Sequence, residues 1–452
     1  MNLQFLGATD TVTGSKYLLW QDESAVLVDC GLFQGYKQLR LRNWSPLPVR
    51  PAAIDAVILT HAHIDHSGWL PLLVRNGFRG RILCTPATLD LCRILLPDSG
   101  HLQEEEANYA NRFSTSKHKP ALPLYTRADA LQCLKQFHAV PHGKAFRPVP
   151  AFNVRMSPSG HMPGSAFVQV DNGSRSVLFS GDIGRPNDMV LKPPVQMDGA
   201  DYLVVESTYG DRVHEASAPL DMLADVVNRT TKRGGVVVIP AFAVGRAQSL
   251  LHCLRILRTQ GRIADVPVYL NSPMAASATA AYLKHGDQLR LDRGECEAMA
   301  SLPHIVQTPE ESEALNSRKG PMIIIAASGM ATGGRVVHHL KAFAPDPRNT
   351  ILLAGHQAGG TRGASILAGA KAVRIHGQDI PVNAEVASLG SLSAHADAPE
   401  IMQWLASFKA PPRMTFITHG EPAASDALRQ RIERELHWQC RVPTYLETTG
   451  LL

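Results

Sequence analysis

The stretch THAHIDHSG, residues 60–68, is the feature that most limits what this chain can fold into. Three histidines and one carboxylate, His61, His63, Asp65 and His66, occupy six consecutive positions directly after the apolar run 56–59. Such side chains, packed together and partly removed from water, would repel one another and lose solvation unless a cation bound them. The stretch therefore predicts a metal site at the end of a short strand.

Other residues able to bind a metal or transfer a proton also follow short apolar runs. They are Asp29 after VLV, His161 after FNVRMSPSG, Asp182 after SVLFSG, Glu206 after DYLVV and His419 after MTFIT. Runs of this kind are typical of strands. Strand ends along one edge of a sheet are rigid and close together, so we expect these side chains to converge on one site.

The number of possible ligands exceeds what one ion needs. A single zinc takes about four ligands, with one position left for water in a catalytic site. His61 and His63 can reach the same ion, whereas Asp65 and His66 lie where the chain turns into a helix and face a slightly different point. With His161, Asp182 and His419 there are seven protein ligands. Two cations ~3.5 to 4 Å apart, bridged by a carboxylate, can hold a hydroxide and the group that it attacks. The prediction is two Zn²⁺ per chain, with Mn²⁺ as the alternative.

Composition limits the remaining possibilities. The chain has 452 residues, enough for two or three domains, and no apolar run long enough to cross a membrane. Its first residues do not resemble a secretion signal, and its seven cysteines form no CxxC pair. We therefore expect a cytoplasmic protein without a membrane partner. A net charge of +5 allows an anionic partner without requiring one.

The motif HxHxDH, with the accompanying aspartates and histidine in order, resembles that of the metallo-β-lactamase superfamily. The matching residues are His61, His63, Asp65, His66, Asp29, His161 and Asp182. The resemblance implies an α/β fold, an αββα sandwich with a dinuclear site at the edge of its sheets. Members of this superfamily hydrolyse lactams, thioesters and phosphodiesters, so the motif alone does not identify the substrate.

Further motifs are similar to those of the β-CASP branch of this superfamily, whose members process RNA or DNA. They are QEEEANYANR (103–112), ESTYGDR (206–212), PAFAVGRAQ (240–248), ASGMATGGR (327–335), SLSAHAD (391–397) and ITHGE (417–421). Between residue 206 and about residue 360, apolar runs alternate with helical patterns, which predicts a parallel sheet flanked by helices. The expected domains are a metallo-β-lactamase domain in two parts, 1–205 and 371–452, and a β-CASP domain inserted at 206–370.

The resemblance also implies roles for individual residues. His61, His63 and His161 would hold one zinc, Asp65, His66 and His419 the other, and Asp182 would bridge them. Asp29 would orient a ligand histidine. His395, held by Glu206, would protonate the leaving oxygen, a role that suits an imidazolium beside a carboxylate. A histidine at position 419 resembles the RNA-directed members of the branch.

Turns from strand to helix in the inserted domain offer backbone N–H groups to phosphates. Arg246, Ser328, Gly329 and Arg335 are the candidates for holding the RNA backbone, and tight turns without a ligand are the alternative. We expect RNA to bind in the cleft between the domains. The chain has GHQAGGTRGA where family members often have GYQAxGTxGR, so His356 replaces an aromatic residue and Ala364 an arginine.

The hypothesis that accounts for all these residues is a zinc-dependent ribonuclease that hydrolyses single-stranded RNA by a two-metal hydroxide mechanism. Internal cutting and 5′ to 3′ exonuclease action both remain open, and a homodimer is expected from the resemblance alone. One alternative is a hydrolase of small esters or thioesters, which leaves Glu206 and His395 unexplained. A DNA-directed nuclease of the same branch and a non-catalytic RNA-binding subunit are the others.

Overall fold

The computed structural model describes residues 1–214, 219–355 and 357–452, so His356 lies outside the described residues. The chain forms two compact units. The first unit comprises residues 1–188, 192–213 and 395–452, and the second comprises residues 189–191 and 214–394. The domain boundaries expected at 205 and 370 remain a prediction.

The first unit contains two seven-stranded sheets. In order across the first sheet, the strands are β22 (Thr448–Gly450), β1 (Asn2–Phe5), β2 (Tyr17–Gln21), β3 (Ser24–Val28), β4 (Ala56–Ile58), β5 (Arg81–Cys84) and β6 (Phe137–Ala139). In the second sheet they are β21 (Cys440–Arg441), β20 (Met414–Thr418), β11 (Tyr202–Glu206), β10 (Ser176–Phe179), β9 (Ala166–Asp171), β8 (Phe152–Pro158) and β7 (Phe146–Val149).

Alternating side chains build the core between these sheets. In β8, Phe152, Val154 and Met156 are buried while Asn153 and Arg155 face outward, as the period of a strand requires. The buried side chains pack with those of the first sheet in one cluster that joins both sheets. The two sheets are therefore held together by an apolar layer.

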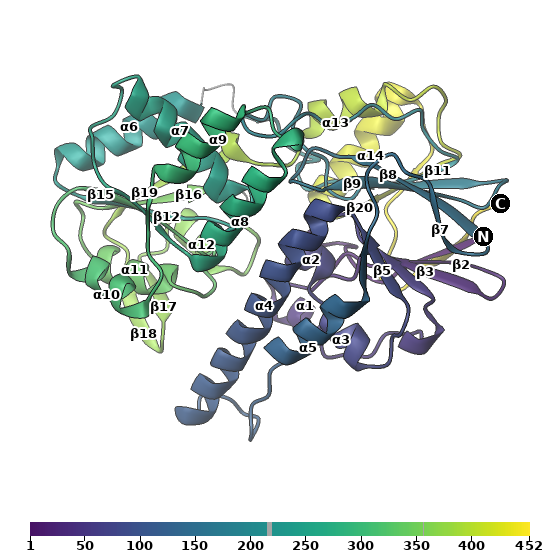
Figure 1. The fold of residues 1–452 in the computed structure, drawn as a ribbon, viewed down its shortest axis with the longest axis horizontal. Helices are drawn as coiled ribbons and strands as arrows, with labels where there is room; N and C mark the ends of the chain where they lie inside the picture. The colour runs from purple at the N-terminus through teal and green to yellow at the C-terminus, as the bar shows by residue number, and fades with distance from the viewer. Residues whose placement is uncertain (215–218, 356) are drawn as a thin grey trace. The chain divides into compact units, whose positions relative to one another are not determined.

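Helices cover the outer faces of both sheets. They are α2 (Ile64–Ser67), α3 (Leu70–Arg75), α4 (Pro86–Arg112), α5 (Arg127–Cys133), α13 (Ala398–Leu405) and α14 (Pro422–Leu436), with 3₁₀ turns at Pro51–Ala53 and Leu134–Gln136. Helix α1 (Lys37–Arg42) also belongs to this unit but has no buried residue. Figure 1 shows α3 and α5 on the side of the first sheet that faces away from the second. Apolar residues of α13 and α14 cover the second sheet. The layers are α, β, β, α, which confirms the expected fold.

The second unit has a six-stranded sheet whose strands are all parallel. In order they are β14 (His304–Ile305), β13 (Val268–Asn271), β15 (Met322–Ala326), β12 (Val236–Pro240), β16 (Thr350–Ala354) and β19 (Glu385–Leu389), with a separate hairpin of β17 (Ala372–Ile375) and β18 (Gln378–Pro381). Every residue of β12, β15 and β16 is buried, as in sheets that helices cover on both faces.

The helices of the second unit alternate with these strands. They are α6 (Pro219–Lys232), α7 (Arg246–Thr259), α8 (Pro273–Lys284), α9 (Arg293–Ser301), α10 (Pro309–Ser317), α11 (Val336–Phe343) and α12 (Arg362–Leu367), with 3₁₀ turns at Gly286–Gln288 and Gly390–Leu392. This arrangement confirms the parallel α/β sheet expected from the sequence. Among the described residues, no helix combines the length and the apolar character that a membrane span requires.

Candidate active site

The strands of the first unit bring the expected ligands to one edge. Asp29 directly follows β3, His61 follows β4 by three positions, and His419 directly follows β20. Neighbouring strands β3 and β4 are parallel, as are β10, β11 and β20, so their carboxyl ends lie on the same side of each sheet. Asp29 and His419 have positive φ angles of 58° and 52°. The backbone is held in an unfavourable conformation at both positions, which is common where side chains must be aimed at a site.

The first cluster of ligand atoms contains His61, His63, His161 and Asp182, all within 4.8 Å of one another. His63 Nδ1 lies 3.2 Å from His61 Nε2 and 3.1 Å from His161 Nε2. Asp182 Oδ2 lies 3.3 Å from His61 Nε2 and 3.4 Å from His161 Nε2. Four ligand atoms therefore surround one point.

The second cluster contains Asp65, His66 and His419, also within 4.8 Å of one another. The Nε2 atoms of His66 and His419 are 3.0 Å apart, and Asp65 Oδ2 is 3.4 Å from His419 Nε2. The other oxygen of Asp182, Oδ1, lies 3.2 Å from His66 Nε2 and 3.6 Å from His419 Nε2. Asp182 thus presents one oxygen to each cluster.

The chemistry of this arrangement fits two cations. Tetrahedral zinc with Zn–N bonds of 2.0–2.1 Å places its ligand atoms about 3.3 Å apart, which is close to the spacing here. Asp182 Oδ1 is buried and has no hydrogen-bond partner among the described residues. Imidazole lone pairs and a bare carboxylate oxygen would repel at these distances without positive charge between them.

The protonation states of the histidines in the clusters also fit the binding of cations. Burial and the neighbouring His66 lower the pKa of His61 to about 3, and burial lowers the pKa of His63 and His161. These histidines are neutral at physiological pH, the form that binds metal. Burial disfavours a proton on His66, but Asp182 and Asp29 outweigh it and raise its pKa. A cation bound at the second cluster would take the place of that proton.

Three side chains contact the Nδ1 atom of a ligand histidine, on the side of the ring away from the clusters. Asp29 Oδ2 accepts a hydrogen bond of 2.7 Å from Nδ1 of His66, because a carboxylate can only accept. Thr60 Oγ1 lies 3.0 Å from Nδ1 of His61, and Thr208 Oγ1 lies 3.0 Å from Nδ1 of His419. In each case Nε2 is left for the cluster.

The two threonines were missed in the sequence interpretation. Thr60 donates to Asp29 Oδ2 and Thr208 donates to the carbonyl oxygen of residue 419, so each hydroxyl can accept the Nδ1–H of its histidine. Their position within the THAHIDH and ESTYG motifs was the available signal. The motifs place a threonine hydroxyl near the site, but only the fold shows which histidine each hydroxyl contacts.

His395 and Glu206 form a pair beside the clusters. His395 Nδ1 lies 3.1 Å from Glu206 Oε2 and 3.9 Å from Asp182 Oδ2. Glu206 is buried and also accepts a hydrogen bond of 2.5 Å from the backbone N–H of Ile183. Burial alone would lower the pKa of His395, but Glu206 and Asp182 outweigh it and raise the pKa to about 9. The imidazole is therefore protonated at neutral pH, and its ring centroid is 4.5 Å from that of His161.

The candidates for binding the RNA backbone lie in the second unit. Arg246 begins α7 and is largely buried, and Ser328, Gly329 and Arg335 lie in or at the end of the loop between β15 and α11. Ser328 Oγ accepts hydrogen bonds from the backbone N–H groups of residues 332 and 333, and a Cβ on Gly329 would clash with Phe242.

Arg335 is used inside the second unit. Its guanidinium donates to Asn271 Oδ1 at 2.8 Å and to the carbonyl oxygens of Val306 at 3.0 Å and Gln307 at 2.6 Å. These contacts and those of Ser328 hold the loop in its shape. Such a role also fits the alternative given above, that of a tight turn without a ligand. Ala364, the departure from the family pattern, lies in the first turn of α12, where its N–H donates to the Thr361 cap.

Three family models match successive parts of the chain. The metallo-beta-lactamase superfamily model matches residues 10–85, the Beta-Casp domain model residues 247–366, and the model of the Zn-dependent metallo-hydrolase RNA specificity domain residues 379–443. The matched segments include four ligands of the clusters in the first model, and His395 and His419 in the third.

Relatives match nearly the whole chain. A ribonuclease of Thermus thermophilus is 37% identical over 93% of this chain and 93% of its own length. Transcription termination factor FttA of Methanosarcina mazei and that of Pyrococcus abyssi are both 32% identical over 99% of this chain, covering 71% and 70% of their lengths. A crystal structure of a protein of unknown function from Enterococcus faecalis matches with a TM-score of 0.54 at 12% identity, covering 100% of this chain and 99% of that one, which supports the fold alone.

The fold and the ligand clusters define a metal-dependent hydrolase. With these matches, the chain belongs to the β-CASP branch of the metallo-β-lactamase superfamily, among its nucleic-acid-processing nucleases.

Proposed function

We propose that this protein is a zinc-dependent ribonuclease that hydrolyses phosphodiester bonds of single-stranded RNA with two metal ions. The observation that carries the proposal is the position of Asp182, with one carboxylate oxygen at each of two ligand clusters. The match to an RNA specificity domain and the similarity to a bacterial ribonuclease support RNA as the substrate.

In this proposal His61, His63 and His161 would hold one zinc ion, Asp65, His66 and His419 would hold the other, and Asp182 would offer one carboxylate oxygen to each. Bound zinc would supply Lewis acidity and lower the pKa of a water molecule at the site. Asp29, Thr60 and Thr208 keep three of the ligand imidazoles in the orientation that binds metal.

His395 is the proposed general acid. Its pKa of about 9 keeps it protonated at neutral pH, so it can donate a proton to the departing 3′ oxygen of ribose. Glu206 orients the ring through Nδ1, which leaves Nε2 to deliver the proton. The pair explains why a carboxylate is buried at this point instead of being exposed to water.

Further parts of the proposal rest on other observations. Arg246, Ser328, Gly329 and Arg335 remain candidates for holding the RNA backbone, directly or by shaping their turns. All seven cysteines are free thiols, which supports a reducing compartment such as the cytoplasm. A homodimer is also proposed, and light scattering of the purified protein tests it.

A time course on 5′-labelled single-stranded RNA, with matched DNA alongside, tests the function. Zinc-loaded protein should cut RNA, and His395→Ala should lower kcat by roughly 10²- to 10⁴-fold while metal content is retained. Immediate release of labelled mononucleotide would indicate a 5′ exonuclease, and labelled fragments of intermediate length would indicate internal cutting. Preferential cutting of DNA, or hydrolysis of small esters without RNA cleavage by protein that holds two metals, would contradict the proposal.

A further inference from the structure

Helix α1 turns most of its surface to solvent, since only Leu39 and Arg42 are half-buried. None of its six residues is buried. Large apolar side chains on and beside it face solvent: Tyr36 is 57% exposed, Leu41 56% and Trp44 59%. A helix this short is unstable by itself, and clustered exposed apolar side chains commonly mark an interaction surface. We call Tyr36, Lys37, Arg40, Leu41 and Trp44 the α1 surface.

The chain segment that carries this surface has charges of one sign. Residues 30–54 contain Lys37, Arg40, Arg42 and Arg50 and no aspartate or glutamate. Within the described part of the chain, no ion pair joins Lys37 or Arg40 to an acid, although Arg40 acts on the carboxyl of Glu106 in α4, where it opposes the rise in pKa that burial causes. Arg42 stacks over Tyr445, with 4.2 Å between its guanidinium carbon and the ring centroid. Aromatic rings beside exposed cations suit a partner with both flat rings and negative charge.

The base of the α1 surface is held firmly. The Asn43 side chain accepts a hydrogen bond from the backbone N–H of Phe33 at 2.9 Å and donates to its carbonyl at 2.8 Å. The indole N–H of Trp69 donates to the carbonyl oxygen of Asn43 at 3.0 Å. Beneath them the buried Lys16 ammonium lies 4.6 Å from the centre of the Phe33 ring. Trp44 therefore projects from a fixed residue rather than from a loose loop.

This anchored segment is continuous with the metal ligands. The backbone N–H groups of Cys30 and Leu32 donate to the carbonyl oxygens of His66 and Ile64, at 2.7 and 2.9 Å. The segment 30–33 thus lies against α2, which carries Asp65 and His66, and α1 begins four residues after Phe33. The α1 surface is tied by short backbone links to the second ligand cluster.

We propose that the α1 surface binds single-stranded RNA outside the ligand clusters, with bases stacked on Trp44 and Tyr36 and phosphates paired with Lys37 and Arg40. Single-stranded nucleic acid is bound by this combination of stacking rings and cations. The inference rests on the proposed function and extends it, because it predicts that longer RNA is held better than a dinucleotide.

Steady-state cleavage of a long single-stranded RNA and of a dinucleotide tests the inference. Trp44→Ala should raise KM for the long RNA by roughly 5-fold or more, with kcat unchanged, because stacking contributes about 1–3 kcal/mol per base. The dinucleotide should be cut as before, and Trp44→Phe should restore most of the affinity. Lys37→Gln with Arg40→Gln should reduce the slope of log KM against log salt by about 0.7 for each phosphate that the protein no longer neutralises.

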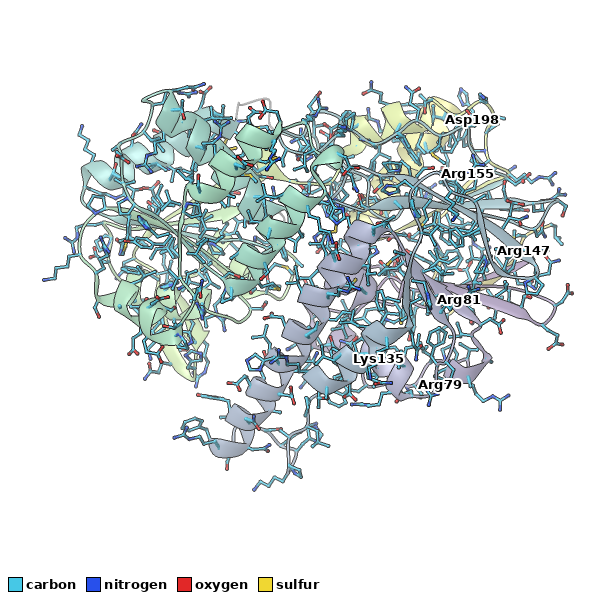
Figure 2. All side chains as sticks on the ribbon, in the orientation of Figure 1. Arg79, Arg81, Lys135, Arg147, Arg155 and Asp198 are labelled. Carbon is cyan, nitrogen blue, oxygen red and sulfur yellow. The ribbon has the colours of Figure 1, made fainter. Side chains whose placement is uncertain are left out.

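Arg81→Gln with Lys135→Gln is the matched control. It removes two cations from the first unit at the amino-terminal ends of β5 and β6, where Figure 2 shows both side chains, away from the strand ends that carry the ligands. An equal effect of this control would mean that only net charge matters, and would overturn the inference. An unchanged KM for the long RNA in Trp44→Ala would also overturn the inference. The same holds if this variant changes only the self-association of the protein.

Failure of the proposed function can be distinguished from failure of the inference about the α1 surface. If the wild-type protein cuts no RNA, the proposed function fails, and fluorescence anisotropy of the uncut RNA then measures binding at the α1 surface directly. Loss of that binding in Trp44→Ala, but not in the control, would still support the α1 surface. Equal binding by both variants would overturn it.

Discussion

Asp182 presents one carboxylate oxygen to each of the two ligand clusters. Each of its oxygens lies within 3.6 Å of two histidine nitrogens, and burial leaves Oδ1 without a hydrogen-bond donor among the described residues. Asp182→Asn keeps the shape but replaces one oxygen with an amide that cannot bind a cation. We expect purified Asp182→Asn protein to hold fewer than two metal ions per chain, measured by elemental analysis, with a loss of RNA cleavage. Full metal content in this variant would contradict the bridging role.

Thr208 offers a more selective change at the residue scale. Its hydroxyl can accept a hydrogen bond from Nδ1 of His419. Loss of such a partner typically weakens metal binding by about 10- to 100-fold. Thr208→Val should therefore weaken binding of one of the two metals, seen as a second, weaker step in a chelator competition titration. Thr208→Ser keeps the hydroxyl and should bind both metals as the wild type does.

The pH profile reports on His395. The pKa is raised from 6.5 to about 9, so the protonated form is present at neutral pH and is lost as pH rises through the raised value. Activity on RNA should fall on the alkaline side, and Glu206→Gln should move that fall to lower pH because the stabilising carboxylate is gone. With a phosphodiester whose leaving group is a nitrophenolate, which needs no acid, the alkaline fall should be absent. An unchanged profile in Glu206→Gln would exclude His395 as the acid.

At the scale of elements, α13 begins three residues after His395, so the cap of this helix can affect the position of that side chain. Asp397 caps the helix through the N–H of Glu400, and the Glu400 carboxylate accepts from the Asp397 N–H and from Arg185. Loss of such a cap costs about 1 kcal/mol. Asp397→Ala should lower the Tm of the first unit by a few degrees and reduce kcat on RNA, while Asp397→Asn, which also caps helices, should stay close to the wild type. Calorimetry and kinetics on the same samples measure both effects.

The elements also show what sequence patterns can predict. The spacing of HxHxDH and the apolar runs before Asp29, Asp182 and His419 predicted the strands and the edge where these residues meet. The α1 surface was not predicted, because exposure of Trp44 depends on packing around Asn43 and Phe33. For the same reason the sequence could not show that Arg335 donates to the carbonyl oxygens of Val306 and Gln307, directly after β14.

At the scale of the whole molecule, each unit has its own core and, among the residues described, the two ligand clusters lie in the first. Because a metal that binds only the folded state stabilises it, chelation should lower the Tm of the first unit and leave that of the second unchanged. Hydrogen exchange during heating, followed peptide by peptide, separates the two. An equal loss of protection in both units would contradict this expectation.

The first unit is built from segments that lie on both sides of the second unit in the chain. His395 and His419 are therefore made after residues 214–394, whereas the other six ligands are made before them. While a ribosome synthesises this protein, the growing chain lacks the proposed proton donor and one proposed ligand until translation has passed residue 419. If the proposed roles hold, the chain could not cut RNA, including the messenger that encodes it, before its own synthesis is nearly complete.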